Sequence, residues 1–219
     1  MKNVLGVLTV LAVLGSTSAS FAAREVGSED FSGWMEDYSS MTYVEESNAF
    51  LFENKEKRGK YKKVMLQSVT VYAKNAKAND GIADQSSDYL TEGVRNLLEQ
   101  KGVLAQEPGP DVLRYSMAIT GVEKSKEELK AHNLFPVSAL FRGATAATGN
   151  LSTYIDAMFE AEMTDSLTGE RVLATVRKGI AETEKTSGDE LTFEDVRPTL
   201  DLWLETFAQT LDDFLAKRS

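Results

Sequence analysis

Residues 153–182, TYIDAMFEAEMTDSLTGERVLATVRKGIAE, contain the pattern that decides the fold. Apolar side chains alternate with polar or charged ones through residues 153–164, and a similar alternation runs through residues 170–182. A period of two is typical of strands that bury one face. Between the two runs, Asp165–Glu170 predicts a tight turn with Gly169 in the left-handed conformation. The stretch therefore predicts a long antiparallel hairpin in the C-terminal half.

Patterns outside the hairpin predict the remaining elements. Residues 63–72 and 112–123 are predicted strands, and the first changes parity at Gln67-Ser68, which indicates a bulge or burial of both faces. Helices are predicted over residues 88–101, within residues 134–148, and over about 20 residues that start near Pro198. The predicted class is α+β, with a mixed, mostly antiparallel sheet packed by about three helices.

Capping residues mark the expected helix ends. Ser86 or Ser87 is the expected N-cap of the helix over 88–101. Gly102 stands just past the end of that helix, where a left-handed glycine is common. Near the C-terminus, Thr192-Phe-Glu-Asp195 favours the start of the last helix.

The first 22 residues have the features of an export signal. Lys2 precedes an eleven-residue apolar run, Val4–Leu14, which is shorter than the about 20 residues that span a bilayer. Small residues lead up to Ala22, so we expect cleavage between Ala22 and Ala23. An uncleaved anchor or a buried helix is the alternative. We expect a periplasmic or secreted protein without a transmembrane span in the mature chain.

The residue counts exclude several classes of site. The 219 residues include no Cys and one His, which excludes disulfides, thiol nucleophiles, zinc–thiolate centres and sites with two imidazoles. The single His132 falls in a predicted loop. The formal charge of −10, which becomes −11 without residues 1–22, argues against broad binding to nucleic acid. We expect no cofactor, no metal and no lipid anchor, and the sequence leaves the oligomeric state open.

Two N-terminal segments are candidate binding surfaces. Residues 23–55 are an expected irregular arm ahead of a single α+β domain over 56–219, and the aromatic side chains of this arm either cap the core or face a partner. The segment Lys55–Lys63 has six basic residues among nine, so it forms either a solvated loop or a contact to an anionic envelope component such as a lipid head group or cell-wall polymer. The candidate partner-binding residues are Trp34, Tyr38, Lys57, Arg58 and Lys60.

Acidic side chains share one face of the predicted hairpin. Asp156, Glu160 and Glu162 are spaced by even numbers on one strand, which places them on the same side. Grouped carboxylates in a desolvated setting could perform acid–base chemistry or hold Ca²⁺. Pairing with Arg171 and Arg177 across the turn would instead make this face structural.

Several short segments occur together in an order that resembles a known bacterial family. These segments are Phe31-Ser-Gly-Trp34, Asp37-Tyr38-Ser39, Tyr61–Val64, Val69–Tyr72, Pro108-Gly-Pro110, Val112–Arg114, Ala118–Thr120, Glu160-Ala-Glu162, Asp165, Thr168-Gly-Glu170 and Thr192–Val196. On them, the sequence resembles domain-of-unknown-function family 3313. The resemblance implies an exported, often lipidated protein with no established activity. This sequence lacks the Cys that would carry the lipid.

Three functions are compatible with the sequence. The expected function is a non-catalytic, envelope-associated protein that binds a protein partner or an envelope component. One alternative is a hydrolase that uses Asp156, Glu160 or Glu162. The other is a carrier of a small apolar ligand, which would need an enclosed cavity between the hairpin and the helices.

Overall fold

The computed structural model describes six stretches of the chain: residues 26–57, 59–67, 69–72, 80–125, 153–183 and 192–216. Several sequence predictions lie outside these residues. They are the export segment 1–22, Arg58, His132 and the helix within 134–148.

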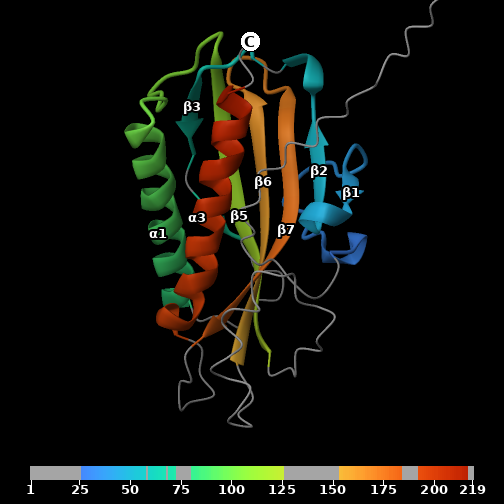
Figure 1. Cartoon of the computed structure of the whole chain (residues 1–219), viewed down its shortest axis with the longest axis vertical. Helices are drawn as coiled ribbons and strands as arrows, with labels where there is room; N and C mark the ends of the chain where they lie inside the picture. The colour runs from blue at the N-terminus through green and yellow to red at the C-terminus, as the bar shows by residue number, and fades with distance from the viewer. Residues whose placement is uncertain are drawn as a thin grey trace, which may run out of the picture.

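The described residues form one seven-stranded sheet whose helices lie against one face (Figure 1). The strands are β1 Thr42–Val44, β2 Ala49–Glu53, β3 Lys63–Leu66, β4 Thr70–Val71, β5 Val112–Ser125, β6 Thr153–Asp165 and β7 Arg171–Thr183. The α-helices are α1 Asp80–Gln100 and α3 Phe193–Ala216, and the short 3-10 helices are η1 Ser28–Asp30, η2 Glu45–Ser47 and η3 Lys55–Lys57. The strand order is β1-β2-β7-β6-β5-β3, with β4 paired to β5.

The α+β class and the mixed, mostly antiparallel sheet are confirmed. Only β3 and β4 run parallel to their neighbour β5, and every other described strand pair is antiparallel. The number of helices differs from the prediction of about three, because the described residues contain two α-helices.

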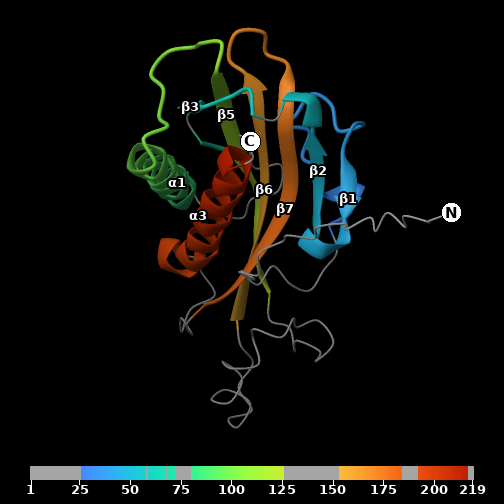
Figure 2. The same ribbon diagram turned by 45° about the horizontal axis from the view of Figure 1, so that its top comes forward.

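The predicted hairpin is confirmed as β6 and β7, which lie side by side near the middle of the sheet (Figure 2). The turn closes through two backbone hydrogen bonds of 2.8 Å, from the Asp165 N–H to the Glu170 carbonyl and from the Gly169 N–H to the Asp165 carbonyl. Gly169 has a φ of +74°, a conformation that glycine adopts without steric strain. The turn is therefore the one that the sequence predicts.

A bulge next to this turn decides which way the β7 side chains point. Met163 pairs with Leu173, whereas Thr164 pairs with Arg171, so Val172 is an extra residue in β7. Val172 packs with the helix-side core, while the next alternate residues, Ala174 and Val176, pack on the opposite face. The hairpin therefore contributes apolar side chains to both faces of the sheet.

The two other predicted strands are confirmed in outline. β5 spans Val112–Ser125 and carries a register shift between Ile119 and Gly121. The predicted strand over 63–72 is divided into β3 and β4, with Gln67 between them. The parity change at Gln67-Ser68 therefore marks an interruption of the strand.

Both α-helices start earlier than predicted. α1 begins at Asp80, and Ser86 is buried within it, so neither Ser86 nor Ser87 is an N-cap. Ile82 extends the apolar stripe by two turns and stabilises the longer helix. The C-terminal end is as predicted, because Gly102 has a φ of +66°.

α3 also begins ahead of the predicted position. It starts at Phe193, so Pro198 lies inside the helix. The predicted capping residues are confirmed. The Thr192 N–H donates to Asp195 Oδ2 at 2.8 Å, and the Asp195 N–H donates to Thr192 Oγ1 at 3.4 Å, which is the reciprocal arrangement of a capping box.

The larger core lies between the sheet and the two helices. Its aromatic centre joins β5 and β6 to α3. The ring centroids of Tyr115 and Phe207 are 4.8 Å apart, and those of Phe159 and Trp203 are 5.8 Å apart. These side chains fill the space between the hairpin and α3, where the ligand-carrier alternative requires a cavity.

The N-terminal arm, residues 26–41, covers the opposite face of the sheet. Buried Val26 and Met35 contact Ala174 and Val176, and the half-buried side chains packed around them include Phe31, Trp34, Tyr38, Met41, Phe50, Phe52 and Met158. The expectation of an irregular segment over 23–55 is wrong for residues 42–53, because β1 and β2 extend the sheet from β7. Their apolar residues escaped the sequence prediction because the strands are only three and five residues long.

Candidate functional site

A fully buried carboxylate joins the arm to the sheet. Glu160 of β6 points to the arm-covered face and has an exposed fraction of 0%. Its Oε1 accepts a hydrogen bond from the Ser32 N–H at 2.8 Å, and its Oε2 accepts one from the Tyr38 hydroxyl at 2.5 Å. A buried carboxylate is costly unless such donors satisfy it. The two bonds therefore make Glu160 an anchor for the arm.

Tyr38 organises the segment that covers this carboxylate. Besides donating to Glu160, its hydroxyl oxygen accepts hydrogen bonds from the N–H groups of Gly33 (3.0 Å) and Met35 (3.1 Å). Its ring stacks on Phe31 with centroids 4.4 Å apart. Burial, together with the bond to the carboxylate, raises the pKa of Tyr38 above its ordinary value. This side chain is part of the folded arm and only half exposed.

A second buried carboxylate joins the basic segment to the hairpin turn. Asp165 Oδ2 accepts hydrogen bonds from Lys60 Nζ and the Tyr61 hydroxyl, both at 2.9 Å. Its Oδ1 accepts bonds from the N–H groups of Leu167 and Thr168, both at 3.0 Å. The bond from Lys60 is the main cause that holds the pKa of Asp165 well below its usual range. Burial and the bond to Asp165 raise the pKa of Tyr61 to about 12.

The basic segment is therefore more than a solvated loop. Lys57 Nζ lies 2.5 Å from Glu170 Oε2, and this contact raises the pKa of Lys57. Lys60 is paired with Asp165, and Tyr61 is buried. Two of the predicted partner-binding cations are thus already in ion pairs with the β6–β7 turn. Arg58 lies outside the described residues.

The remaining predicted carboxylates separate in the structure. Glu162 Oε2 accepts a hydrogen bond from Arg171 Nε at 3.2 Å, which is the structural pairing that the sequence suggests. Arg177 does not join this face, because it pairs in register with Phe159 of the helix-side core. Asp156 lies opposite Ile180 in the β6–β7 ladder, and its side chain is outside the described part of the structure.

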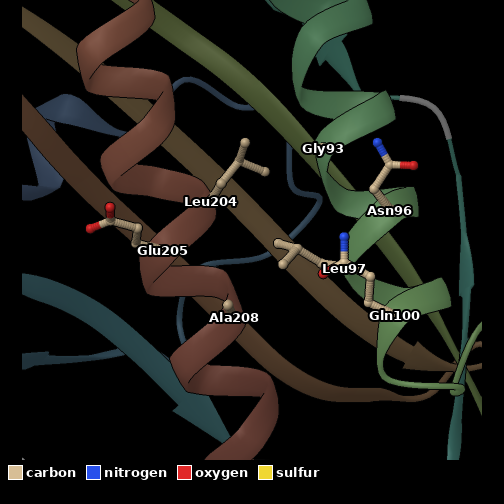
Figure 3. A pocket seen from close by; sticks show the side chains of 7 residues that line it. All are labelled: Gly93, Asn96, Leu97, Gln100, Leu204, Glu205 and Ala208. Atoms are coloured by element: carbon tan, nitrogen blue, oxygen red, sulfur yellow. The ribbon is translucent and has the colours of Figure 1, made fainter.

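A groove opens between α1 and α3 (Figure 3). It has a volume of about 290 Å³, and its lining residues are Gly93, Asn96, Leu97, Gln100, Leu204, Glu205 and Ala208. Leu97 and Leu204 extend into the gap from the two helices. At Gly93 a Cβ would lie 2.6 Å from Leu204 Cδ1, so the glycine permits this close approach of the helices. No sequence pattern indicates this groove, because it depends on how two helices that are distant in the chain align.

The described residues show neither a cluster of metal ligands nor a membrane-spanning helix. Across the described ranges, which omit residues 126–152 and shorter gaps, no group of three or more His, Asp or Glu side chains could hold a metal ion. In the same part of the chain, no helix combines the length and the apolarity that crossing a membrane requires.

The model of a family described as a protein of unknown function, DUF3313, matches residues 30–207. The chain belongs to the DUF3313 family. A curated relative, the uncharacterized lipoprotein YdcL of Escherichia coli K12, is 24% identical over 200 residues, which cover 88% of this chain and 90% of YdcL. The family resemblance seen in the sequence is thereby confirmed.

Two solved structures are similar to this DUF3313 chain. One is a neuraminyllactose-binding hemagglutinin homolog from Helicobacter pylori, with a TM-score of 0.46, 10% identity, and coverage of 76% of this chain and 92% of the other. The second is a minor lipoprotein from Acinetobacter baumannii, with a TM-score of 0.35, 12% identity, and coverage of 72% and 93%.

The segments that resemble DUF3313 in the sequence meet at the two buried carboxylates. The segment around Ser32 and the segment around Tyr38 converge on Glu160. The segment that begins at Tyr61 converges on Asp165. Glu160 is a catalytic candidate from the sequence alone, and no local signal indicates its partner, because 122 residues separate it from Tyr38.

Proposed function

We propose that this DUF3313 chain is an exported, non-catalytic protein of the bacterial envelope that binds a protein partner. The observation that carries the proposal is the structural role of Glu160 in the contact between the arm and the sheet. This carboxylate is fully buried and bonded to two donors of the arm, so it holds the fold together and offers no exposed group to a substrate.

Export is supported by two further observations. The first 22 residues combine Lys2, an apolar run and small residues ahead of Ala22, the pattern of a cleaved signal. The relative YdcL is named as a lipoprotein, and bacterial lipoproteins are exported. We propose the periplasm or the medium outside it as the destination.

The carboxylate-hydrolase alternative has less support from the side chains. Glu160 is buried beneath the arm, and Glu162 is paired with Arg171. The carrier alternative is likewise less favoured, because aromatic side chains fill the region between the hairpin and α3. The open groove between α1 and α3 fits a partner's side chains better than an enclosed ligand.

Site-specific photo-crosslinking in bacterial cells tests the proposal. A crosslinking residue is placed at exposed positions on three surfaces: Glu36 on the arm, Leu167 in the β6–β7 turn and Asn96 on α1. We expect the chain in the periplasmic fraction or the medium with Ala23 as its first residue, and a discrete protein adduct from at least one surface. A cytoplasmic, uncleaved chain or the absence of adducts from all three surfaces would contradict it.

A further inference from the structure

The chain's negative charge is concentrated in its two helices. α1 contains five acidic residues and one Arg, and α3 contains six acidic residues and one Arg. Their combined formal charge is −9, compared with −10 for the whole chain. The helical layer therefore carries most of the chain's net negative charge, whereas Lys57 and Lys60 of the basic segment are paired with acidic residues at the hairpin turn.

The groove between the helices has defined ends. The Tyr89 hydroxyl donates to Asp201 at one end, and Lys101 Nζ lies 2.6 Å from Asp212 Oδ1 at the other. Tyr89 precedes Lys101 along α1, and their partners Asp201 and Asp212 follow each other in the same order along α3. The two helices therefore run parallel and side by side. Between these contacts, Leu97 and Leu204 supply an apolar lining that is only partly buried.

Exposed acidic residues surround this apolar lining. Glu92 and Glu99 lie one turn before and after Asn96 on α1, and Glu205 lines the groove from α3. All three are exposed, and none has a salt bridge among the described residues. Arg95 lies beside them on α1, and Lys101 is paired with Asp212, so the charge around the lining is mainly acidic. An apolar lining with a mainly acidic rim complements an apolar surface flanked by Lys or Arg.

We propose that the α1–α3 groove binds a cationic amphipathic segment of a partner protein, with its apolar side chains in the groove and its Lys or Arg residues against the acidic rim. The inference rests on the proposed binding function and names the site for it. The charge of the helical layer opposes the other candidates. A second copy of this face, an anionic lipid surface and nucleic acid would each bring like charges together.

Binding of a designed probe peptide to the purified mature chain tests this inference. The peptide is an amphipathic helix with leucines on one face and lysines at its flanks, and its counterpart carries glutamates in place of the lysines. Fluorescence anisotropy gives the dissociation constant at roughly 20 mM and roughly 200 mM salt. We expect binding of the lysine peptide that weakens with salt, and no binding of the glutamate peptide.

Two matched sets of charge reversals locate the binding surface. The triple variant Glu92→Lys, Glu99→Lys, Glu205→Lys is compared with Glu36→Lys, Glu45→Lys, Glu56→Lys, which changes the net charge equally at exposed positions outside α1 and α3. The groove triple should weaken binding at least about tenfold, and the control triple less than about threefold. Equal weakening would show only general charge attraction and would overturn the inference.

Filling the groove tests the contribution of its apolar lining to peptide binding without a change in charge. Ala208→Trp places a large side chain in the groove, and Gln100→Trp does so from an exposed position if the first variant does not fold. Either variant should weaken the binding of the lysine peptide at least about tenfold. Unchanged binding in a folded variant would overturn the inference.

The crosslinking experiment separates this inference from the proposed function. Adducts from Glu36 or Leu167, with none from Asn96, would leave the proposed function in place and overturn the groove as its site. An Asn96 adduct consisting of two copies of this chain would also overturn it, because the occupant would then be a second copy.

Discussion

Two buried polar side chains show how hydrogen bonding determines what a single residue contributes to the stability of the fold. Asp165 is almost completely buried but satisfied by four hydrogen bonds. Tyr115 is equally buried, but its hydroxyl has no hydrogen-bond partner among the described residues. Burial raises the pKa of Tyr115 well above its ordinary value. These two residues should therefore respond to substitution in opposite ways.

Asp165→Asn should reduce the stability of the protein and flatten its acid dependence. The folded pKa of Asp165 lies well below the unfolded value of about 3.9, so its stabilising contribution is complete above that value and is lost as the pH falls through the folded pKa. We expect a loss of about 2 kcal/mol at neutral pH. Urea unfolding between about pH 6 and pH 2 should show a shallower decline below pH 4 for the variant.

The exposed substitution Asp84→Asn is the control for Asp165→Asn. It should leave both the free energy of unfolding and the acid slope close to those of the parent. An identical acid slope in the parent and in Asp165→Asn would contradict the role assigned to the Lys60–Asp165 pair.

Tyr115→Phe should stabilise the protein by about 1 kcal/mol, because it removes a buried hydroxyl that lacks a partner. Tyr61→Phe removes a hydroxyl that donates to Asp165 and should destabilise by a similar amount. Thermal unfolding of both variants provides the comparison. A loss of stability in Tyr115→Phe would show that its hydroxyl has a partner, such as an ordered water.

At the scale of elements, the arm and the hairpin depend on each other. The arm supplies the donors that satisfy Glu160, and Glu160 fixes the arm on β6. The bulge at Val172 turns Ala174 and Val176 toward the arm, which gives its aromatic side chains an apolar surface to cover. The arm is therefore a part of the fold, held by the two hydrogen bonds to Glu160, by a bond from the Arg171 guanidinium to the Asp37 carbonyl, and by a small apolar core.

Tyr38→Phe should loosen the arm without unfolding the sheet. The variant removes one of the two donors to a buried carboxylate, which should cost about 2 kcal/mol. Hydrogen exchange should accelerate at the amides of residues 32–38, whereas the amides of α1 keep their protection. Uniform acceleration in both regions would indicate that the arm and the helices open only together.

At the scale of the whole molecule, one sheet separates two cores of different size. The helix-side core joins β5 and β6 to both helices, and the arm-side core consists of a few residues around Met35 and Val176. Because the smaller core has fewer apolar contacts, its opening should cost less free energy than global unfolding.

Leu200→Ala and Met35→Ala compare the two cores, since both side chains are buried. Leu200→Ala should lower global stability by about 3 kcal/mol, because it leaves a cavity in the core between the helices and the sheet. Met35→Ala should mainly increase exchange and proteolysis within the arm. Equal effects of the two variants on the exchange of the β5 amides would contradict the separation into two cores.

The sequence alone determined the parts of this protein that rest on local patterns. The hairpin, its Gly169 turn, the strand over 112–123 and the capping of α3 were predicted correctly. Alternation, a helical stripe and a cap each extend over neighbouring residues, so they can be detected without knowing the fold. The membership in DUF3313 was also recognisable from the sequence, through short segments in a fixed order.

Only the tertiary structure decided what depends on distant contacts. Glu160 became an anchor because Tyr38 meets it across 122 residues, and β1 and β2 are too short to signal themselves before they pair with β7. The one-residue bulge at Val172 redirected the β7 side chains, which a simple alternation does not reveal. The α1–α3 groove likewise exists only where the two parallel helices meet. Pairing, register and helix alignment are properties of the folded chain, and they decided which residues are buried and which surface is open to a partner.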